Sequence, residues 1–166
     1  MLRNLRDIVL AIIFGIPLVI LVILVIPLFV ISAPFRYLER KRFEEKYAKF
    51  LIEMNGKNFF CYNNRKNSKE FIEQNIIPNL TDGIEIVYLN GKKIESEYPA
   101  EFISQALYKL TNYSRFPHVM KIRNGKLIDK SVNNPFYNVL NLNKPKTELL
   151  NQINRFFELN EIKSVA

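Results

Sequence analysis

The sequence predicts an α/β domain, with a mixed four-stranded sheet flanked by helices, that follows one N-terminal transmembrane helix. Three observations lead to this prediction. Residues 8–31 are an unbroken run of uncharged, almost wholly aliphatic side chains. After residue 50, short apolar runs typical of strands alternate with segments that have the helical period. Two alternating runs also flank Asn124-Gly125, the strongest short signal for a β-hairpin.

The apolar run over residues 8–31 is long enough to cross a membrane. A helix rises about 1.5 Å per residue, so about 20 residues cross the roughly 30 Å hydrocarbon core of a bilayer. Pro17 and Pro27 each remove a helix hydrogen bond and are expected to kink the span. A cleaved signal peptide is the alternative, but its apolar region has only about 7–15 residues, and Pro34 directly follows the one candidate cleavage bond. The run therefore predicts a retained anchor.

The basic residues on either side of the anchor predict its orientation. Arg3 and Arg6 precede the span, and a larger group follows it: Arg36, Arg40, Lys41, Arg42, Lys46 and Lys49. Because the flank richer in Lys and Arg stays in the cytoplasm, we expect a cytoplasmic C-terminal domain. The membrane would be the cell (inner) membrane, with an organellar inner membrane as the alternative. We expect four of these side chains to lie against anionic lipid headgroups at the membrane surface: Arg36, Arg40, Lys41 and Arg42.

Composition limits the chemistry of the remaining residues. The chain carries a formal net charge of +8, but its Lys and Arg side chains after residue 50 are scattered and form no nucleic-acid-binding motif. Cys61 is the only cysteine and His118 the only histidine. The chain can therefore form neither an intrachain disulfide nor a Cys/His metal cluster. We expect no metal, no cofactor and no nucleic-acid partner.

The part after the anchor is expected to begin with an amphipathic helix and a buried strand. Residues 35–54 carry apolar side chains at helical spacing on one face: Phe43, Tyr47, Phe50, Leu51 and Met54. Asn55-Gly56 ends this helix, since Gly suits the left-handed cap. Residues 58–62 are an apolar run too short for a helix, which favours a strand buried on both faces.

Two helices and one strand are expected between residues 69 and 110. The first helix covers about residues 69–78, with Ser68 as its N-cap. Residues 84–89 predict a second strand, which ends at an Asn-Gly turn. The next helix follows Pro99 and has apolar side chains at helical spacing: Phe102, Ile103, Ala106, Leu107 and Leu110.

The C-terminal part predicts a hairpin, a long loop and a final helix. Residues 118–123 and 126–129 are the two strands of the hairpin. The loop carries Pro135 and Pro145, and the last helix covers about residues 147–160. Strands joined by a crossover helix pair in parallel, whereas hairpin strands pair antiparallel. The sheet should therefore be mixed, with helices on both faces.

The order of elements and one local pattern carry a resemblance to a known family. In the run RFPHVMKIRNGKL, residues 115–127, a proline directly precedes a strand, an Asn-Gly turn and a second strand. With the element order over about residues 43–160, this pattern resembles the thioredoxin-like fold, in which a cis-proline occupies the position of Pro117. We therefore expect three parts: an N-terminal tail and transmembrane helix (1–34), a basic juxtamembrane amphipathic helix (35–54) and, from the resemblance, a thioredoxin-like domain (55–166).

The family's redox motif, Cys-x-x-Cys, is missing from this chain. It would lie between the first strand and the following helix, where the sequence reads Arg65-Lys66-Asn67-Ser68. Dithiol–disulfide exchange needs one thiolate that attacks and a second thiol that resolves, so the family's usual activity cannot be carried over. Cys61 could serve as a single reactive thiol, but its place inside an apolar run favours an inert core side chain.

The resemblance points to a protein-binding surface where the redox site would lie. We expect it to comprise the loop after the first strand and the residues around the proline: Asn63, Asn64, Arg65, Ser68, Phe116, Pro117 and His118. A cis-proline would leave backbone groups of Phe116 free to pair with an extended peptide, as the family does with its substrates. The alternatives are structural: a solvated loop with Ser68 as an ordinary N-cap, a turn at Pro117, and a packed His118.

We expect a single-pass membrane protein whose redox-inactive thioredoxin-like domain acts as a protein-binding adaptor or as an accessory subunit of a membrane complex. Its partners would be the lipid bilayer and another membrane protein. The first alternative is an enzyme: a membrane-tethered monothiol or thiol-ligand-dependent reductase or transferase that uses Cys61 or Ser68. The second is a structural anchor, in which the span and residues 36–49 organise lipid or neighbouring spans.

Overall fold

The computed structural model describes the backbone of residues 2–160 and the side chains of residues 13–27, 29 and 31–160. Two compact units divide the chain, residues 1–46 and residues 47–166. Arg3 and Arg6, which entered the prediction of membrane orientation, lie outside the residues whose side chains are described.

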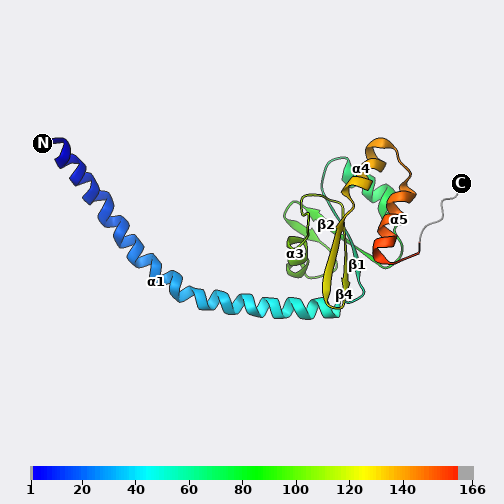
Figure 1. The fold of residues 1–166 in the computed structure, drawn as a ribbon, viewed down its shortest axis with the longest axis horizontal. Coiled ribbons are helices and arrows are strands. Elements are labelled where there is room, and N and C mark those ends of the chain that lie inside the picture. Colours follow the sequence, from blue (N-terminus) through cyan, green and yellow to red (C-terminus); the bar gives the residue numbers. More distant parts are fainter. Residues whose placement is uncertain (1, 161–166) are drawn as a thin grey trace. The chain divides into compact units, whose positions relative to one another are not determined.

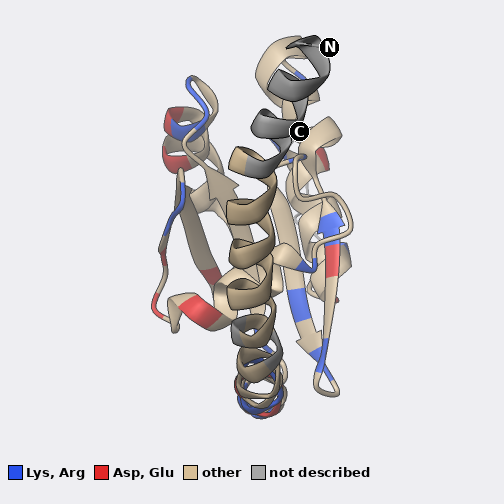
Figure 2. Cartoon of the chain, turned by 90° about the vertical axis from the view of Figure 1, so that its left-hand side faces the viewer, with Lys and Arg blue, Asp and Glu red and all other residues tan. Residues whose placement is uncertain are grey.

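A single helix, α1 (Leu2–Glu53), forms the first unit and continues into the second. Pro17, Pro27 and Pro34 all lie within it, and the described backbone stays helical through each of them. By length and composition this helix is able to cross a membrane, and none of its apolar stretch is buried inside the protein. Figure 2 shows its uncharged turns in tan, with Lys, Arg and Glu gathered at its lower end. α1 thus contains both the span and the amphipathic helix that the sequence predicted as separate elements.

The second unit is built on a mixed five-stranded sheet in the order β3-β2-β1-β4-β5. β1 pairs with β2 in parallel, and the other three pairings are antiparallel. The strands are β1 (Asn58–Asn63), β2 (Ile84–Asn90), β3 (Lys93–Glu95), β4 (His118–Arg123) and β5 (Lys126–Ser131). The predicted number of four strands is wrong, because β3 forms a short hairpin with β2 through Gly91 and Lys92. The sequence of β3 gives no strand signal, since Ile94 is the one apolar residue of this strand.

The helical segments of this unit differ from the prediction in two places. They are α2 (Ser68–Phe71), the π-helical η1 (Ile72–Ile76), the 3₁₀ turn η2 (Ile77–Asn79), α3 (Ala100–Tyr108), α4 (Asn133–Leu142) and α5 (Lys146–Phe157). The helix predicted over residues 69–78 is three short segments of different pitch, and Ser68 is its first helical residue rather than its N-cap. The predicted loop around Pro135 contains α4, because proline is tolerated in a first turn, where its missing N–H has no helical partner to lose.

Side chains pack against both faces of the sheet. Successive residues of β1 point to opposite faces, and Phe60 and Tyr62 join one core cluster with side chains of η1, α4 and α5. On the other face, the rings of Phe50, in the last turns of α1, and Phe102, in α3, have centroids 4.9 Å apart. Figure 1 shows α3 on one side of the sheet, with α4 and α5 on the other.

Candidate functional site

The loop that follows β1 lies beside the loop that precedes β4. The strand register produces this, because Cys61 near the end of β1 is opposite His118 at the start of β4. Between the loops is a hollow of about 250 Å³, here called the loop hollow, lined by Asn63, Asn64, Arg65, Leu89, Gly91, Tyr113, Ser114 and Phe116. Four of the seven residues predicted to bind a partner are thus brought together: Asn63, Asn64, Arg65 and Phe116.

Hydrogen bonds hold the loop after β1 in place. The Asn64 backbone N–H donates to the Leu89 carbonyl at 3.0 Å, and its Nδ2 atom donates to Oδ1 of Asn90 at 3.2 Å. The Arg65 guanidinium reaches the opposite loop, where Nη2 donates to the Ser114 carbonyl at 3.4 Å. Asn64 and Arg65 remain exposed. Their amide and guanidinium groups therefore form the polar rim of the loop hollow.

Hydrogen bonds connect the loop before β4 to the first residue of α4, Asn133, and to Val132, which precedes that helix. The Phe116–Pro117 peptide bond is cis, as the resemblance implied. The Phe116 carbonyl accepts a hydrogen bond from Nδ2 of Asn133, and the Pro117 carbonyl accepts one from the Val132 N–H at 3.0 Å. The expectation that the backbone groups of Phe116 are free is therefore wrong for its carbonyl. Pro117 is buried, so it supports the hollow without lining it.

Ser68 does not line the loop hollow and instead contacts Tyr137. Its side chain is buried, and the two hydroxyl oxygens are 3.1 Å apart. Burial raises the pKa of Tyr137, but its hydrogen bonds with Ser68 and Arg65, together with the Arg65 charge, outweigh that effect and lower the pKa below its ordinary value. Arg65, Ser68 and Tyr137 thus form one polar cluster. The sequence prediction missed Tyr137 because it lies in α4, where a loop was expected.

His118 is fully buried rather than exposed at a surface. Its Nε2 atom lies 2.7 Å from the Asn112 carbonyl oxygen, and its Nδ1 atom lies 3.8 Å from Oδ2 of Asp129. Burial is the largest effect on the pKa of His118 and lowers it, against the opposing effects of the Asn112 carbonyl and the Asp129 charge. The imidazole is therefore neutral near pH 7 and belongs to the core beneath the loop.

The only thiol of the chain is inaccessible in this structure. Cys61 has 0% of its surface exposed, and its register partners are Val87 in β2 and His118 in β4. Burial raises the pKa of Cys61 well above its ordinary value. Because a cysteine reacts as its thiolate, Cys61 has the properties of a core side chain and not of a nucleophile.

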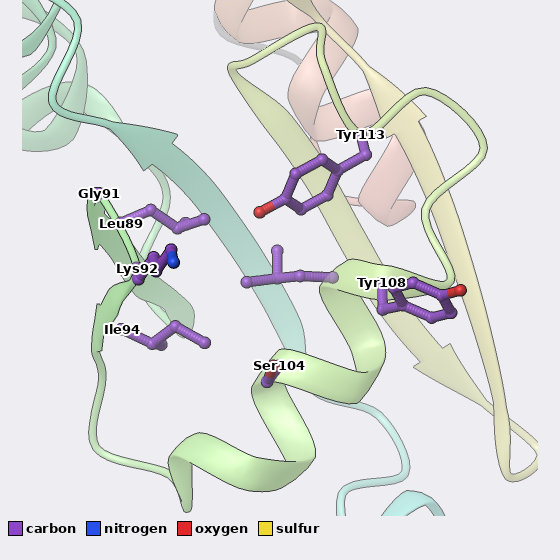
Figure 3. Close-up of a pocket in the computed structure, with 8 residues that line it drawn as sticks. Leu89, Gly91, Lys92, Ile94, Ser104, Tyr108 and Tyr113 are labelled. Carbon is purple, nitrogen blue, oxygen red and sulfur yellow. The ribbon is translucent and has the colours of Figure 1, made fainter. Parts of the chain in front are cut away.

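A second hollow adjoins the first and lies between the β2–β3 hairpin and α3. This apolar hollow has a volume of about 530 Å³ and is lined by Leu89, Gly91, Lys92, Ile94, Ser104, Leu107, Tyr108 and Tyr113. It shares Leu89, Gly91 and Tyr113 with the loop hollow. In Figure 3, Leu89 and Ile94 point toward α3, and Tyr113 reaches from the following loop toward the hairpin. The sequence does not reveal this hollow, because one of its walls is the unpredicted strand β3.

The basic residues predicted at the membrane surface all occupy exposed positions of α1: Arg36, Arg40, Lys41 and Arg42. Arg40 forms an ion pair with Glu44, one turn further on, at 3.0 Å. Nη2 of Arg36 donates to Oγ of Ser32 at 2.9 Å. The charged side chains therefore begin directly after the apolar stretch of the same helix.

No family model, curated protein or solved structure matches the chain. Among the described residues, no group of three or more His, Cys, Asp or Glu side chains is placed to hold a metal ion. The fold and the site define an α/β domain on a mixed five-stranded sheet, preceded by one apolar helix long enough to span a membrane.

Proposed function

We propose that the chain is a single-pass membrane protein whose thioredoxin-like domain lacks redox activity and binds another protein, as an adaptor or as an accessory subunit of a membrane complex. The order of elements supports the thioredoxin-like assignment. A parallel β1–β2 pair, connected through a helix, is followed by the antiparallel β4–β5 hairpin and by the final helix α5. In this proposal β3 and α4 are additions to the order that the family shares.

One observation carries the binding role: an open hollow with polar side chains lies where the redox site of a thioredoxin-like domain would be, while the only thiol is buried. The amides of Asn63 and Asn64 donate and accept hydrogen bonds, and Arg65 donates in a fork geometry that suits carboxylates and carbonyls. Tyr113 and Phe116 add apolar surface beside them. Protein interfaces combine an apolar centre with a polar rim, and the loop hollow offers both.

The apolar helix supports a location at a membrane. In the proposed arrangement the uncharged turns of α1 cross the bilayer of the cell (inner) membrane, and the following basic side chains contact anionic headgroups: Arg36, Arg40, Lys41 and Arg42. More Lys and Arg residues follow the apolar run than precede it. The α/β domain is therefore proposed to lie in the cytoplasm.

The enzyme alternative receives no support from Cys61, whose thiol is buried and held protonated by its raised pKa. Its second form would use the hydroxyl of Ser68 to activate a bound thiol ligand. That hydroxyl is buried and already bonded to Tyr137. The protein-binding role needs neither group to be exposed, so it agrees better with these two environments.

Co-purification of the full-length chain tests the proposal. The tagged protein is extracted in a gentle detergent at native expression, and bound proteins are identified by mass spectrometry. Asn64→Lys adds bulk and charge at the rim of the loop hollow, and Asn141→Lys makes the same change at an exposed position of α4. A stoichiometric membrane partner that the wild type and N141K retain, and that N64K loses, is the expected result. A protein without a partner, or a partner that N64K retains, contradicts the proposal.

A further inference from the structure

We propose that the apolar hollow binds one large apolar side chain from an extended, acidic segment of the partner protein, whose flanking carboxylates pair with Lys92 and Arg65. This inference rests on the proposed function, because it identifies the kind of segment that the binding domain accepts. The apolar hollow, between the β2–β3 hairpin and α3, is then a second binding surface. It lies next to the loops where the resemblance places the first one.

The shape and composition of the apolar hollow fit a side chain. Leu89 and Ile94 of the hairpin form one wall, and Ser104 and Leu107 of α3 form the other. Figure 3 shows the small side chain of Ser104 on α3, across from Ile94. The volume of about 530 Å³ falls in the range of about 300–1,000 Å³ that is usual for ligand pockets. The apolar walls favour an aliphatic or aromatic group, which loses its contact with water on entering.

Two exposed tyrosines border the apolar hollow. Tyr108 is 82% exposed and Tyr113 is 53% exposed. In Figure 3 the ring of Tyr113 overhangs the hollow, whereas that of Tyr108 points away from Leu89 and Ile94 at the end of α3. Tyrosine is enriched at the centres of protein interfaces, where its ring packs and its hydroxyl pairs. The Tyr113 ring gains burial when a partner segment covers the hollow.

The charged side chains around the two hollows favour a partner segment of negative charge. Arg65 and Lys92 are the charged side chains that line them, and both are basic. Neither forms an ion pair with a carboxylate of the described residues, whereas the neighbouring Lys93 pairs with Glu95 at 3.2 Å. An acidic segment supplies a carboxylate for each of these two basic groups and favours a correct register on the surface.

The two hollows adjoin, which suits an extended segment rather than an isolated small molecule. Leu89, Gly91 and Tyr113 belong to both. A segment that places its apolar side chain near Ser104 therefore continues past Tyr113 toward Arg65. Successive side chains of an extended chain point to opposite sides about 3.3 Å apart along its length, so one segment can place an apolar side chain in one hollow and a carboxylate at the rim of the other.

A peptide array tests the inference on the full-length chain in phosphatidylcholine nanodiscs, which carry no anionic lipid. Immobilised seven-residue peptides hold Leu, Phe or Tyr at the centre, flanked by Asp and Glu, by Lys and Arg, or by Ser and Gly. Ser104→Trp fills the apolar hollow from an exposed helix position, and Asn141→Trp is its control on α4. Lys92→Glu reverses one rim charge, with Lys144→Glu as its control at another exposed lysine.

The wild type is expected to retain acidic peptides about tenfold more strongly than basic ones, because close charge pairs across an interface contribute on this scale. S104W should lose this binding. K92E should lose the preference for acidic peptides, because Arg65 is then the one basic group left at the rim, while N141W and K144E behave as wild type. Equal retention of all peptide classes, or unchanged binding by S104W, overturns the inference. Self-association of the chain that S104W abolishes, without peptide binding, also overturns it by showing a second copy as the occupant.

The same variants separate this inference from the proposed function. Capture of the membrane partner that N64K abolishes and S104W leaves intact supports the loop hollow and overturns the role of the apolar hollow. Capture that S104W abolishes and N64K leaves intact supports the apolar hollow and contradicts the proposed site at the loops. Loss with both variants, but not with N141K and N141W, supports one continuous surface.

Discussion

The Nδ1 atom of His118 lies 3.8 Å from Oδ2 of Asp129, while Nε2 of the same ring lies 2.7 Å from the Asn112 carbonyl oxygen. A carbonyl oxygen only accepts hydrogen bonds, so Nε2 carries the proton of the neutral ring. Nδ1 is then left without a hydrogen-bond partner among the described residues. Protonation of Nδ1 would pair it with Asp129, but burial of the ring dominates and lowers the pKa of His118.

We expect the stability of the α/β unit to fall as the pH drops below about 6.5, the ordinary pKa of histidine. In this range the unfolded chain binds the His118 proton more readily than the folded protein, whose pKa is lower, so protons favour unfolding. The contribution of neutral His118 to stability is fully present above the pKa that histidine has in the unfolded chain. The measurement is the midpoint of thermal unfolding of the full chain in mild detergent, between pH 7.5 and pH 5.

His118→Gln is the control for this pH dependence, because glutamine retains an amide that can donate toward Asn112 but does not titrate. His118 is the only histidine, so its replacement should flatten the curve between pH 7.5 and pH 5. Glu85 and Glu158 have lowered pKa values and therefore weaken stability only at more acidic pH. An unchanged slope in H118Q contradicts the assignment.

Cys61 should resist thiol reagents in the native protein. Its side chain has 0% exposed surface, and burial raises its pKa, so both access and thiolate formation are opposed. We expect labelling by a maleimide at pH 7.5 only at the rate at which the domain opens. The variant Asn141→Cys places a second thiol at an exposed position of α4 and should react at once, as the internal control. Rapid labelling of Cys61 in the wild type would instead support the alternative of a monothiol enzyme.

The elements that the sequence predicted well are those with strong local signals. The Asn124-Gly125 turn is the clearest case: both residues have positive φ, 52° and 67°, as the hairpin turn requires. The Gly91-Lys92 turn makes the same kind of connection, with Asn90 paired to Lys93. The sequence predicted a turn at Asn90-Gly91 but not the strand after it, because β3 is three residues long and offers almost no alternating pattern. Pairing with β2, rather than local preference, makes β3 a strand.

The candidate site was only partly predictable from the sequence. The resemblance identified the two loops that meet at the loop hollow, but it could not show which side chains face solvent. His118 begins β4, a strand covered on both faces, so no alternation distinguishes its buried from its exposed positions. The contact of Ser68 with Tyr137 joins residues far apart in the chain and depends on α4, which the prolines had concealed.

The Ser68–Tyr137 hydrogen bond should appear as a coupling in a double-mutant cycle. We expect Ser68→Ala and Tyr137→Phe to be non-additive by about 0.5–1.5 kcal/mol in the free energy of unfolding, the usual net value of such a bond. Urea unfolding followed by circular dichroism measures it. Ser68→Ala combined with Tyr108→Phe should be additive, since the Tyr108 hydroxyl group belongs to an 82% exposed side chain. Additivity in the first pair contradicts the contact.

Arg123 should contribute more to stability than other partly exposed cations. Its Nη2 atom donates to Oδ1 of Asn58 at 2.8 Å and to the Phe157 carbonyl at 3.4 Å, which ties β4 to β1 and to the end of α5. Arg123→Ala leaves these acceptors without their donor, and we expect a loss of about 1–3 kcal/mol in urea unfolding. Lys126→Ala, at an exposed position of β5, should change stability little. Equal losses of stability in the two variants would contradict a stabilising role for the Arg123 hydrogen bonds.

The orientation of the proposed membrane span should depend on the basic residues after it and not on the acidic ones. The Lys and Arg residues that follow outnumber Arg3 and Arg6, which precede it. Neutralising the cluster removes this excess, so a C-terminal tag should become accessible to protease from the non-cytoplasmic side in part of the molecules. The variant changes four residues to Gln: Arg36, Arg40, Lys41 and Arg42.

The matched control changes the acidic residues of the same stretch to Gln: Glu39, Glu44 and Glu45. Acidic side chains contribute little to orientation, so its tag should stay protected as in the wild type. The control also removes the Arg40–Glu44 ion pair, which separates loss of that contact from loss of positive charge. A wild-type tag that protease removes from outside would place the α/β domain on the opposite side of the membrane. The proposed cytoplasmic partner would then have to be sought on that side.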